Sequence, residues 1–184
     1  MTKISNAELA LLSLIAEQPR HAYEIEQVIE ERNIRYWTEL GFSSIYRILS
    51  KLEESGWLDG QMQPPEGRGP ARKVYHLTSA GKKVWQQAAL DNLAKPVRKY
   101  SSFLLGLDNL SELPPDEALG AVHINLTDQQ SIYQQLSLAY ENHPLREDFF
   151  ISNFFDYILN QLAADIKWLQ DFSERLETHY QSVK

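Results

Sequence analysis

The sequence has 184 residues, of which 43% are hydrophobic and 23% charged, enough for one sizeable core or two small globular domains. It contains no cysteine, which excludes disulfides, thiol catalysis and cysteine-based zinc sites and fits a reducing compartment. The net charge of −7 on its own argues against a nucleic-acid ligand, but the charges are unevenly distributed along the chain. Residues 43–99 hold ten lysines and arginines against five acidic residues, whereas residues 100–184 hold four against thirteen. A locally basic segment of this kind is compatible with a surface that binds a polyanion.

No apolar run approaches the roughly 18 residues that a membrane helix requires. The apolar segment 7–16 (AELALLSLIA) is short and has acidic flanks, so we interpret it as a core helix and not as a signal sequence. The sequence therefore predicts a cytoplasmic protein without a membrane partner.

Hydrophobic periodicity and turn residues predict helices 5–17, 21–32 and 43–55, strands 57–63 and 72–77, and helices 79–95, 114–142 and 145–181. Ser5 or Asn6 can cap the first helix, Gly56 ends the third, and Thr78 caps the fourth. Residues 64–71 (PPEGRGPA) forbid a helix and predict a hairpin with an exposed tip. The predicted fold is mainly α. A winged helix-turn-helix with a two-stranded β wing spans residues 1–95, and an all-helical dimerisation domain spans residues 96–184.

The third predicted helix has two unlike faces. Ile45, Ile48, Leu49 and Leu52 cluster on one side, and the remaining surface carries Ser43, Ser44, Tyr46, Arg47, Ser50, Lys51 and Glu54. Hydroxyls near a helix N-terminus can reach phosphates or base edges, Arg47 can donate two hydrogen bonds to guanine, and Lys51 can reach a phosphate. The alternative interpretation is the solvated face of an ordinary amphipathic helix.

The predicted hairpin favours the DNA interpretation because it brings together Arg68, Arg72 and Lys73, opposed only by Glu66. In a winged helix this loop lies along the sugar-phosphate backbone or enters the minor groove. The helix and the hairpin thus predict the same surface. A winged helix used for protein–protein contact is the rival interpretation, but it has no need of three basic groups near its tip.

Three motifs in order resemble the PadR family of bacterial transcriptional regulators: HAYEI at 21–25, SSIY at 43–46 followed by GWL at 56–58, and GPARKVYHLT at 69–78. The close resemblance covers residues 8–82; beyond it the likeness is architectural, to the longer subgroup with a helical C-terminal domain. It implies a homodimeric repressor that binds a partly palindromic double-stranded DNA operator and releases it on binding a small aromatic or toxic compound.

The resemblance also implies DNA contacts at Tyr23, Ser43, Ser44 and Tyr46, and a basic wing at Arg72 and Lys73. Two positions depart from the family pattern. Arg47 stands where many relatives have proline, and Ala22 stands where many have glycine. We expect Arg47 to confer a base preference that differs from that of relatives.

The last predicted helix carries an apolar seam of coiled-coil type, in which Phe155, Leu162, Leu169 and Leu176 fall seven residues apart. We predict that this seam joins two chains and that its interface residues are Ile151, Phe155, Ile158, Leu162, Leu169 and Leu176. Packing within a single chain is the alternative.

Aromatic residues predict an effector cavity between the domains or across a dimer, lined by Trp37, Trp85, Phe103 and Trp168. Core packing is the alternative for each of them. The five histidines lack the spacing of metal ligands, and no glycine-rich phosphate loop follows a strand, so we predict no metal, no cofactor and no enzymatic activity.

Overall fold

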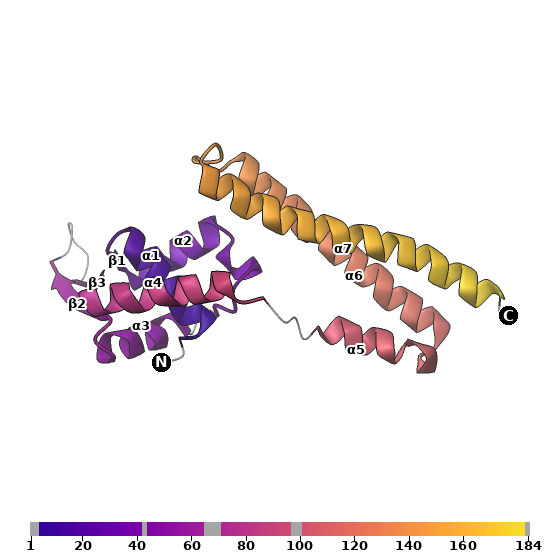
Figure 1. Cartoon of the computed structure of the whole chain (residues 1–184), viewed down its shortest axis with the longest axis horizontal. Helices are drawn as coiled ribbons and strands as arrows, with labels where there is room; N and C mark the ends of the chain where they lie inside the picture. The colour runs from indigo at the N-terminus through magenta and orange to yellow at the C-terminus, as the bar shows by residue number, and fades with distance from the viewer. Residues whose placement is uncertain (1–3, 42–43, 65–70, 97–100, 183–184) are drawn as a thin grey trace. The chain divides into compact units, whose positions relative to one another are not determined.

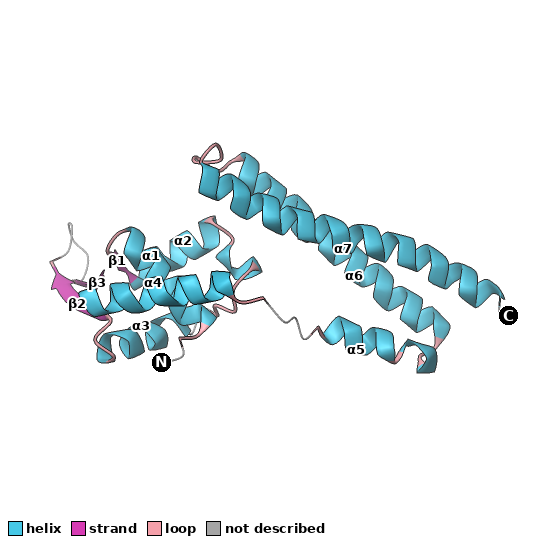
Figure 2. Ribbon diagram, in the orientation of Figure 1, coloured by secondary structure: helices cyan, strands magenta, loops and turns pink. Residues whose placement is uncertain are grey.

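The structure, a computed structural model, describes residues 4–41, 44–64, 71–96 and 101–182. The chain forms two compact units, Met1–Val97 and Arg98–Lys184. The elements of the first unit are α1 (Asn6–Glu17), β1 (Arg20–His21), α2 (Ala22–Glu31), the 3-10 helix η1 (Ile34–Tyr36), α3 (Ser44–Glu54), β2 (Leu58–Gln63), β3 (Arg72–Leu77) and α4 (Ser79–Ala94) (Figures 1 and 2). Those of the second are α5 (Ser102–Asp108), the 3-10 helix η2 (Leu110–Glu112), α6 (Pro115–Glu141) and α7 (Phe149–Ser182).

The ends of the helices in the first unit follow from local hydrogen bonds. Ser5 caps α1, because its Oγ accepts the Glu8 N–H at 3.2 Å while the Glu8 carboxylate accepts the Ser5 N–H at 2.7 Å. Thr78 caps α4 by accepting the Gly81 N–H at 2.9 Å. Gly56 follows α3 with a φ of 71°, the left-handed conformation expected of it.

The sheet has three antiparallel strands in the order β1-β3-β2, one more than the predicted two-stranded wing. The β2–β3 hairpin runs in register from Leu58 opposite Leu77 to Gln63 opposite Arg72. The added strand β1 has only two residues, too few for an alternating pattern, and it pairs His21 with Val74. This pairing holds the start of α2 against the wing strand β3.

The core of the first unit lies between α1, α2 and α3. The side chains that solvent does not reach are those of Leu11, Leu12, Ile25, Ile29, Ile45, Leu49 and Leu52. Ile48 is also buried, so the predicted apolar face of α3 is confirmed. Burial of this face turns the opposite face of α3 outward.

In the second unit α6 and α7 lie side by side (Figure 2). Their core contains Val122, Leu169 and Leu176, with half-buried apolar residues packed around them from α5, η2, α6 and α7. The prediction missed the short helix α5 and began the last helix at residue 145. Helix α7 starts at Phe149 because the Asp148 carboxylate accepts the N–H groups of Phe150 and Ile151 at 2.9 and 3.1 Å.

Much of the apolar seam of α7 packs within the chain. Phe155, Leu169 and Leu176 are 6%, 2% and 6% exposed, and the Phe155 ring stacks on Tyr140 of α6 with 5.0 Å between the ring centroids. Within the chain these three positions therefore pack as the alternative interpretation expects, because heptad spacing suits a helix of the same chain as well as one of a partner, and their interchain contact stays a prediction. Interface roles for Ile151, Ile158 and Leu162, which are half-buried, stay predictions. No helix in the described part of the chain is long and apolar enough to span a membrane.

Candidate nucleic-acid interface

A surface hollow of about 520 Å³ lies in the first unit where the start of α2, α3 and the wing strand β3 meet. Its lining residues are His21, Ala22, Tyr23, Tyr46, Ala71, Arg72, Lys73 and Tyr75. Tyr23 and Tyr46 are 62% and 64% exposed, whereas Tyr75 is buried. Four of the predicted DNA contacts (Tyr23, Tyr46, Arg72 and Lys73) thus meet at one hollow.

The outward face of α3 presents Tyr46, Arg47, Ser50 and Lys51, all exposed. Among the described side chains, none forms an ion pair with Arg47, so its guanidinium donors are available to a ligand. The Ser44 hydroxyl donates to the Gly41 carbonyl at 2.5 Å and is half-buried. Ser44 can therefore offer a ligand only the acceptor side of its hydroxyl.

Lys51 is held by a carboxylate of the same unit. Its Nζ lies 2.6 Å from Oε1 of Glu8, which is 4% exposed. Burial on its own would raise the pKa of Glu8, but the hydrogen bonds from Lys51 and Ser5 outweigh it and hold that pKa below 4.5. Lys51 therefore joins α3 to α1, a use that its position on the outward face of α3 did not predict.

Lys73 is also paired. Its Nζ donates to Oε2 of Glu53 at 2.6 Å and lies 5.6 Å from the centre of the Tyr75 ring. The hydrogen bond to Glu53 raises the pKa of Lys73, and burial raises the pKa of Tyr75. The ion pair connects the last turn of α3 to the wing, and the sequence reasoning did not assign a role to Glu53.

Arg72 points to a different neighbour, because successive residues of a strand face opposite sides of the sheet. Its Nη1 lies 3.0 Å from Nε2 of His21. His21 also caps α2, since its Nδ1 accepts the Glu24 N–H at 3.1 Å and the Glu24 carboxylate accepts the His21 N–H at 3.2 Å. Arg72 thus lies beside the start of α2, a proximity that the sequence did not predict because β1 leaves no pattern in it.

Two predicted contacts, Ser43 and Arg68, lie outside the described residues.

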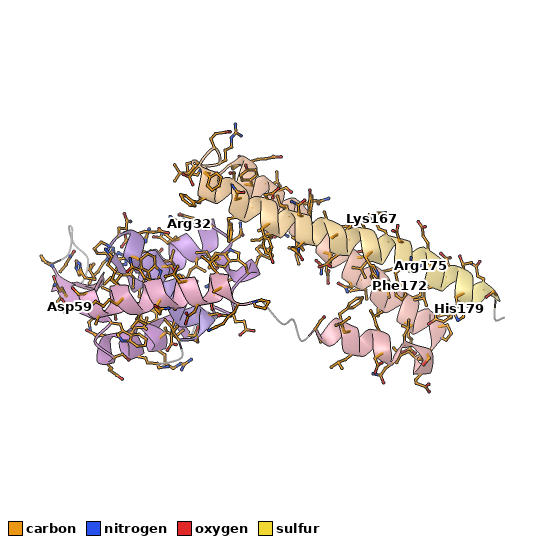
Figure 3. All side chains as sticks on the ribbon, in the orientation of Figure 1. Arg32, Asp59, Lys167, Phe172, Arg175 and His179 are labelled. Carbon is orange, nitrogen blue, oxygen red and sulfur yellow. The ribbon has the colours of Figure 1, made fainter. Side chains whose placement is uncertain are left out.

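Asp59, an acidic residue of β2, is exposed near the wing end of the first unit, as Figure 3 shows. Its carboxylate accepts from the Gln61 amide at 2.8 Å and has no cation beside it in the described ranges. Residues 4–41, 44–64, 71–96 and 101–182 contain no cluster of three side chains suited to a metal ion.

The predicted effector residues divide between the two units. In the first unit Trp85 packs on the core and donates from Nε1 to Ser13 Oγ at 3.0 Å, while Trp37 follows η1. In the second unit Phe103 and Trp168 meet edge to face with 5.8 Å between the centroids of their rings. A second hollow, of about 490 Å³, lies between α6 and α7 and is lined mainly by polar residues such as Tyr133, Tyr140, Asn153 and Asp156. None of the four predicted aromatics lines it.

Comparisons with known proteins agree with this geometry. Residues 11–87 match the model of the Transcriptional regulator PadR-like family. Three crystal structures are similar over nearly the whole chain. Bacillus subtilis PadR in complex with operator DNA is 22% identical, with 92% of this chain and 98% of that chain covered and a TM-score of 0.71. A PadR-like transcriptional regulator from Bacillus cereus is 20% identical, with 95% and 98% covered and a TM-score of 0.73.

Bacillus subtilis PadR in complex with p-coumaric acid is 22% identical, with 92% and 98% covered and a TM-score of 0.68. At these identities the likeness concerns the fold, and it extends over both units. None of the curated proteins matches the sequence significantly. The matched residues contain α2, α3, the wing and the hollow between them, so the winged helix of the first unit is similar to that of the PadR-like family of transcriptional regulators.

Proposed function

We propose that the protein is a sequence-specific DNA-binding transcriptional regulator in which α3 enters the major groove and the β2–β3 hairpin contacts the sugar-phosphate backbone. The observation that carries the proposal is the set of exposed donors around one hollow. Tyr23, Tyr46 and Arg72 border it, and Arg47 follows Tyr46 on the exposed face of α3. Aromatic and basic side chains gathered at the start of a recognition helix and beside a wing are suited to a DNA backbone and the edges of its bases.

The contacts divide by chemistry. Arg47 has five N–H donors and no ion-pair partner among the described residues, and it would read a guanine through two hydrogen bonds. The hydroxyls of Tyr23, Tyr46 and Ser50 and the Arg72 guanidinium would bind phosphates. Ser43 and Arg68 stay in the proposed interface on the strength of the sequence alone. The rival use of this surface, protein–protein contact, has no comparable support, because the hollow is bordered by basic groups on the wing side.

The proposed working form is a cytoplasmic homodimer that acts as a repressor. Two copies would present their α3 helices to successive major grooves about 34 Å apart, as a partly palindromic operator requires. Phe149 and Phe150, exposed at the start of α7, offer apolar surface for such an assembly. The similarity to Bacillus subtilis PadR in complex with operator DNA supports DNA as the partner.

A small aromatic compound is the proposed effector, supported by the similarity to Bacillus subtilis PadR in complex with p-coumaric acid. Trp37, Trp85, Phe103 and Trp168 remain the predicted effector residues. Adding p-coumaric acid to the protein–DNA complex tests this part directly. Release of the duplex at a concentration that leaves protein folding unchanged is expected, and undiminished binding with every small aromatic acid tried would contradict it.

Hydroxyl-radical footprinting of the whole protein on DNA from upstream of its own gene tests the proposed binding mode. A homodimer with two α3 helices in adjacent grooves should protect two groups of sugars separated by about one helical turn. A single protected group would contradict the dimeric arrangement. If the protein binds DNA fragments but protects no defined group of sugars on any of them, sequence-specific binding would be contradicted.

A further inference from the structure

We propose that Glu53 limits the affinity of the protein for DNA of any sequence, because its carboxylate competes with DNA phosphates for Lys73. The inference rests on the proposed function and adds to it a residue that does not itself touch DNA. It concerns sequence-independent binding, so it can be measured on any duplex.

The Glu53–Lys73 pair lies between α3 and the wing. Nζ of Lys73 is 2.6 Å from Oε2 of Glu53, and both side chains are partly exposed. Lys73 also lines the hollow that Tyr23 and Tyr46 border. The cation is therefore near the proposed path of the DNA backbone while a carboxylate already neutralises it.

Gly60 of β2 makes room for this pair. It lies opposite Tyr75 in the hairpin, diagonal to Lys73 and on the same face of the sheet. A Cβ at Gly60 would lie 2.5 Å from Oε1 of Glu53 and would collide with Cε of Lys73. The absence of a side chain at Gly60 is thus what lets the two charged ends meet above β2.

The other basic groups of the proposed interface differ from Lys73. Arg72 faces a histidine nitrogen and not a carboxylate, and Arg47 has no ion-pair partner among the side chains that the structure describes. Lysine and arginine side chains that neutralise phosphates release counterions, and each such contact steepens the dependence of binding on salt by about 0.9 in the log–log slope. A lysine that must first leave a carboxylate contributes less to this slope than one that is unpaired.

The consequence is a lower affinity for random DNA. Sequence-independent binding depends almost entirely on phosphate contacts, so removing one of them weakens it. Contacts to bases, such as the one proposed for Arg47, are not affected by the pair. Glu53 would therefore lower the affinity for all duplexes by a similar factor and leave discrimination between sequences to base contacts.

The test is the equilibrium binding of a scrambled duplex at several salt concentrations, measured for the full-length protein, four single variants and the double variant Glu53→Gln/Lys73→Gln. Glu53→Gln retains the size of the side chain and a hydrogen-bond acceptor but removes the charge. Gly60→Ala retains both charges and forces their ends apart. Lys73→Gln removes the cation. Asp59→Asn, on the exposed side of β2, is the control for Glu53→Gln because it makes the same change in net charge.

Glu53→Gln and Gly60→Ala should each steepen the salt dependence by about 0.9 and tighten binding to the scrambled duplex roughly fivefold near physiological salt. Lys73→Gln on its own should change the slope little, and the double variant Glu53→Gln/Lys73→Gln should return to the slope of the parent. Thermal unfolding of each variant checks that the fold is retained, as expected for partly exposed side chains.

Two results would overturn the inference while leaving the proposed function in place. In one, Asp59→Asn steepens the slope as much as Glu53→Gln, which assigns the effect to net charge. In the other, Glu53→Gln and Gly60→Ala leave the slope unchanged although the parent discriminates between duplexes. If the parent binds no duplex at any salt concentration, the proposed function fails and the inference fails with it.

Discussion

Nζ of Lys51 lies 2.6 Å from Oε1 of Glu8, so α3 is tied through its outward face to the first turn of α1. Glu8 is nearly buried, and its other oxygen accepts the Ser5 N–H at 2.7 Å. One carboxylate therefore caps α1 and positions α3. This relationship makes the stability of the winged helix sensitive to acid.

Protonation of Glu8 should destabilise the first unit. Although burial favours the neutral acid, the hydrogen bonds from Lys51 and Ser5 prevail and the pKa in the folded protein lies below 4.5. The folded state then binds fewer protons than the unfolded chain around that pH, so this contribution to stability is complete above about pH 4.5 and is lost as the pH falls through the folded pKa. Urea unfolding between about pH 7 and pH 3 measures it. Glu8→Gln should be less stable at neutral pH and should flatten the acid dependence.

The exposed residue Glu31 provides the matched control for this series. Glu31→Gln makes the same change in charge on α2 and should leave the acid dependence of the unfolding free energy close to that of the parent. An equal flattening in both variants would show that the effect comes from net charge and not from the Glu8–Lys51 pair.

Leu169→Ala should destabilise a single protomer, because this residue is 2% exposed and packs with Val122 and Leu176. Truncation of a buried leucine costs about 2–5 kcal/mol. Leu138→Ala in α6, where the side chain is 56% exposed, is the control and should cost less than about 0.5 kcal/mol. Chemical unfolding at several protein concentrations gives both values. A Leu169→Ala variant that changed only the association between chains would contradict packing within the protomer.

Arg47→Ala should remove the preference for one base without changing stability. The Arg47 side chain is exposed and makes no ion pair with the described residues, so its removal costs the fold no such contact. Loss of two hydrogen bonds to a guanine lowers discrimination by about 1–3 kcal/mol, or roughly 5- to 150-fold in relative affinity. Competition between the preferred duplex and single-base variants of it measures this change. Retention of the full preference would mean that Arg47 does not contact bases.

Arg72→Ala should weaken binding to all duplexes by a similar factor and should reduce the salt slope by about 0.9, as expected for one lost phosphate contact. Arg72→Lys is the informative comparison, because it retains the charge but cannot keep the planar group beside His21 at the observed 3.0 Å. It should recover most of the salt slope. Weakening confined to a single sequence would place Arg72 at a base and not at the backbone.

Local patterns were sufficient to predict most of the elements. The Ser5 and Thr78 caps, the positive φ of Gly56 and the buried side of α3 all depend on residues within four positions of one another. The same locality explains the failures. Strand β1 has two residues and no period, and α7 starts late because Asp148 caps it three residues beyond the predicted start.

Long-range pairing could not be predicted from the sequence. Lys51 finds Glu8, and Lys73 finds Glu53, only when separate elements have packed. The phosphate contacts of both lysines stay predictions based on their places on the polar face of α3 and on the wing, and periodicity does not reveal a carboxylate that reaches them from another element. The α7 seam was ambiguous for a related reason, since a heptad repeat specifies an apolar stripe but not the chain that covers it.

The most direct measurement of the central claim is fluorescence anisotropy of the full-length protein with labelled duplexes tiled across the region upstream of its gene, and with a scrambled duplex, at several salt concentrations. A sequence-specific regulator should bind one tile at least about a thousandfold more tightly than the scramble, and its affinity should fall steeply with salt. Equal and weak binding to every tile would contradict an operator in that region and reduce the interface to a basic patch. Absence of binding even at low salt would contradict the proposed use of α3 and the wing as a DNA-binding surface.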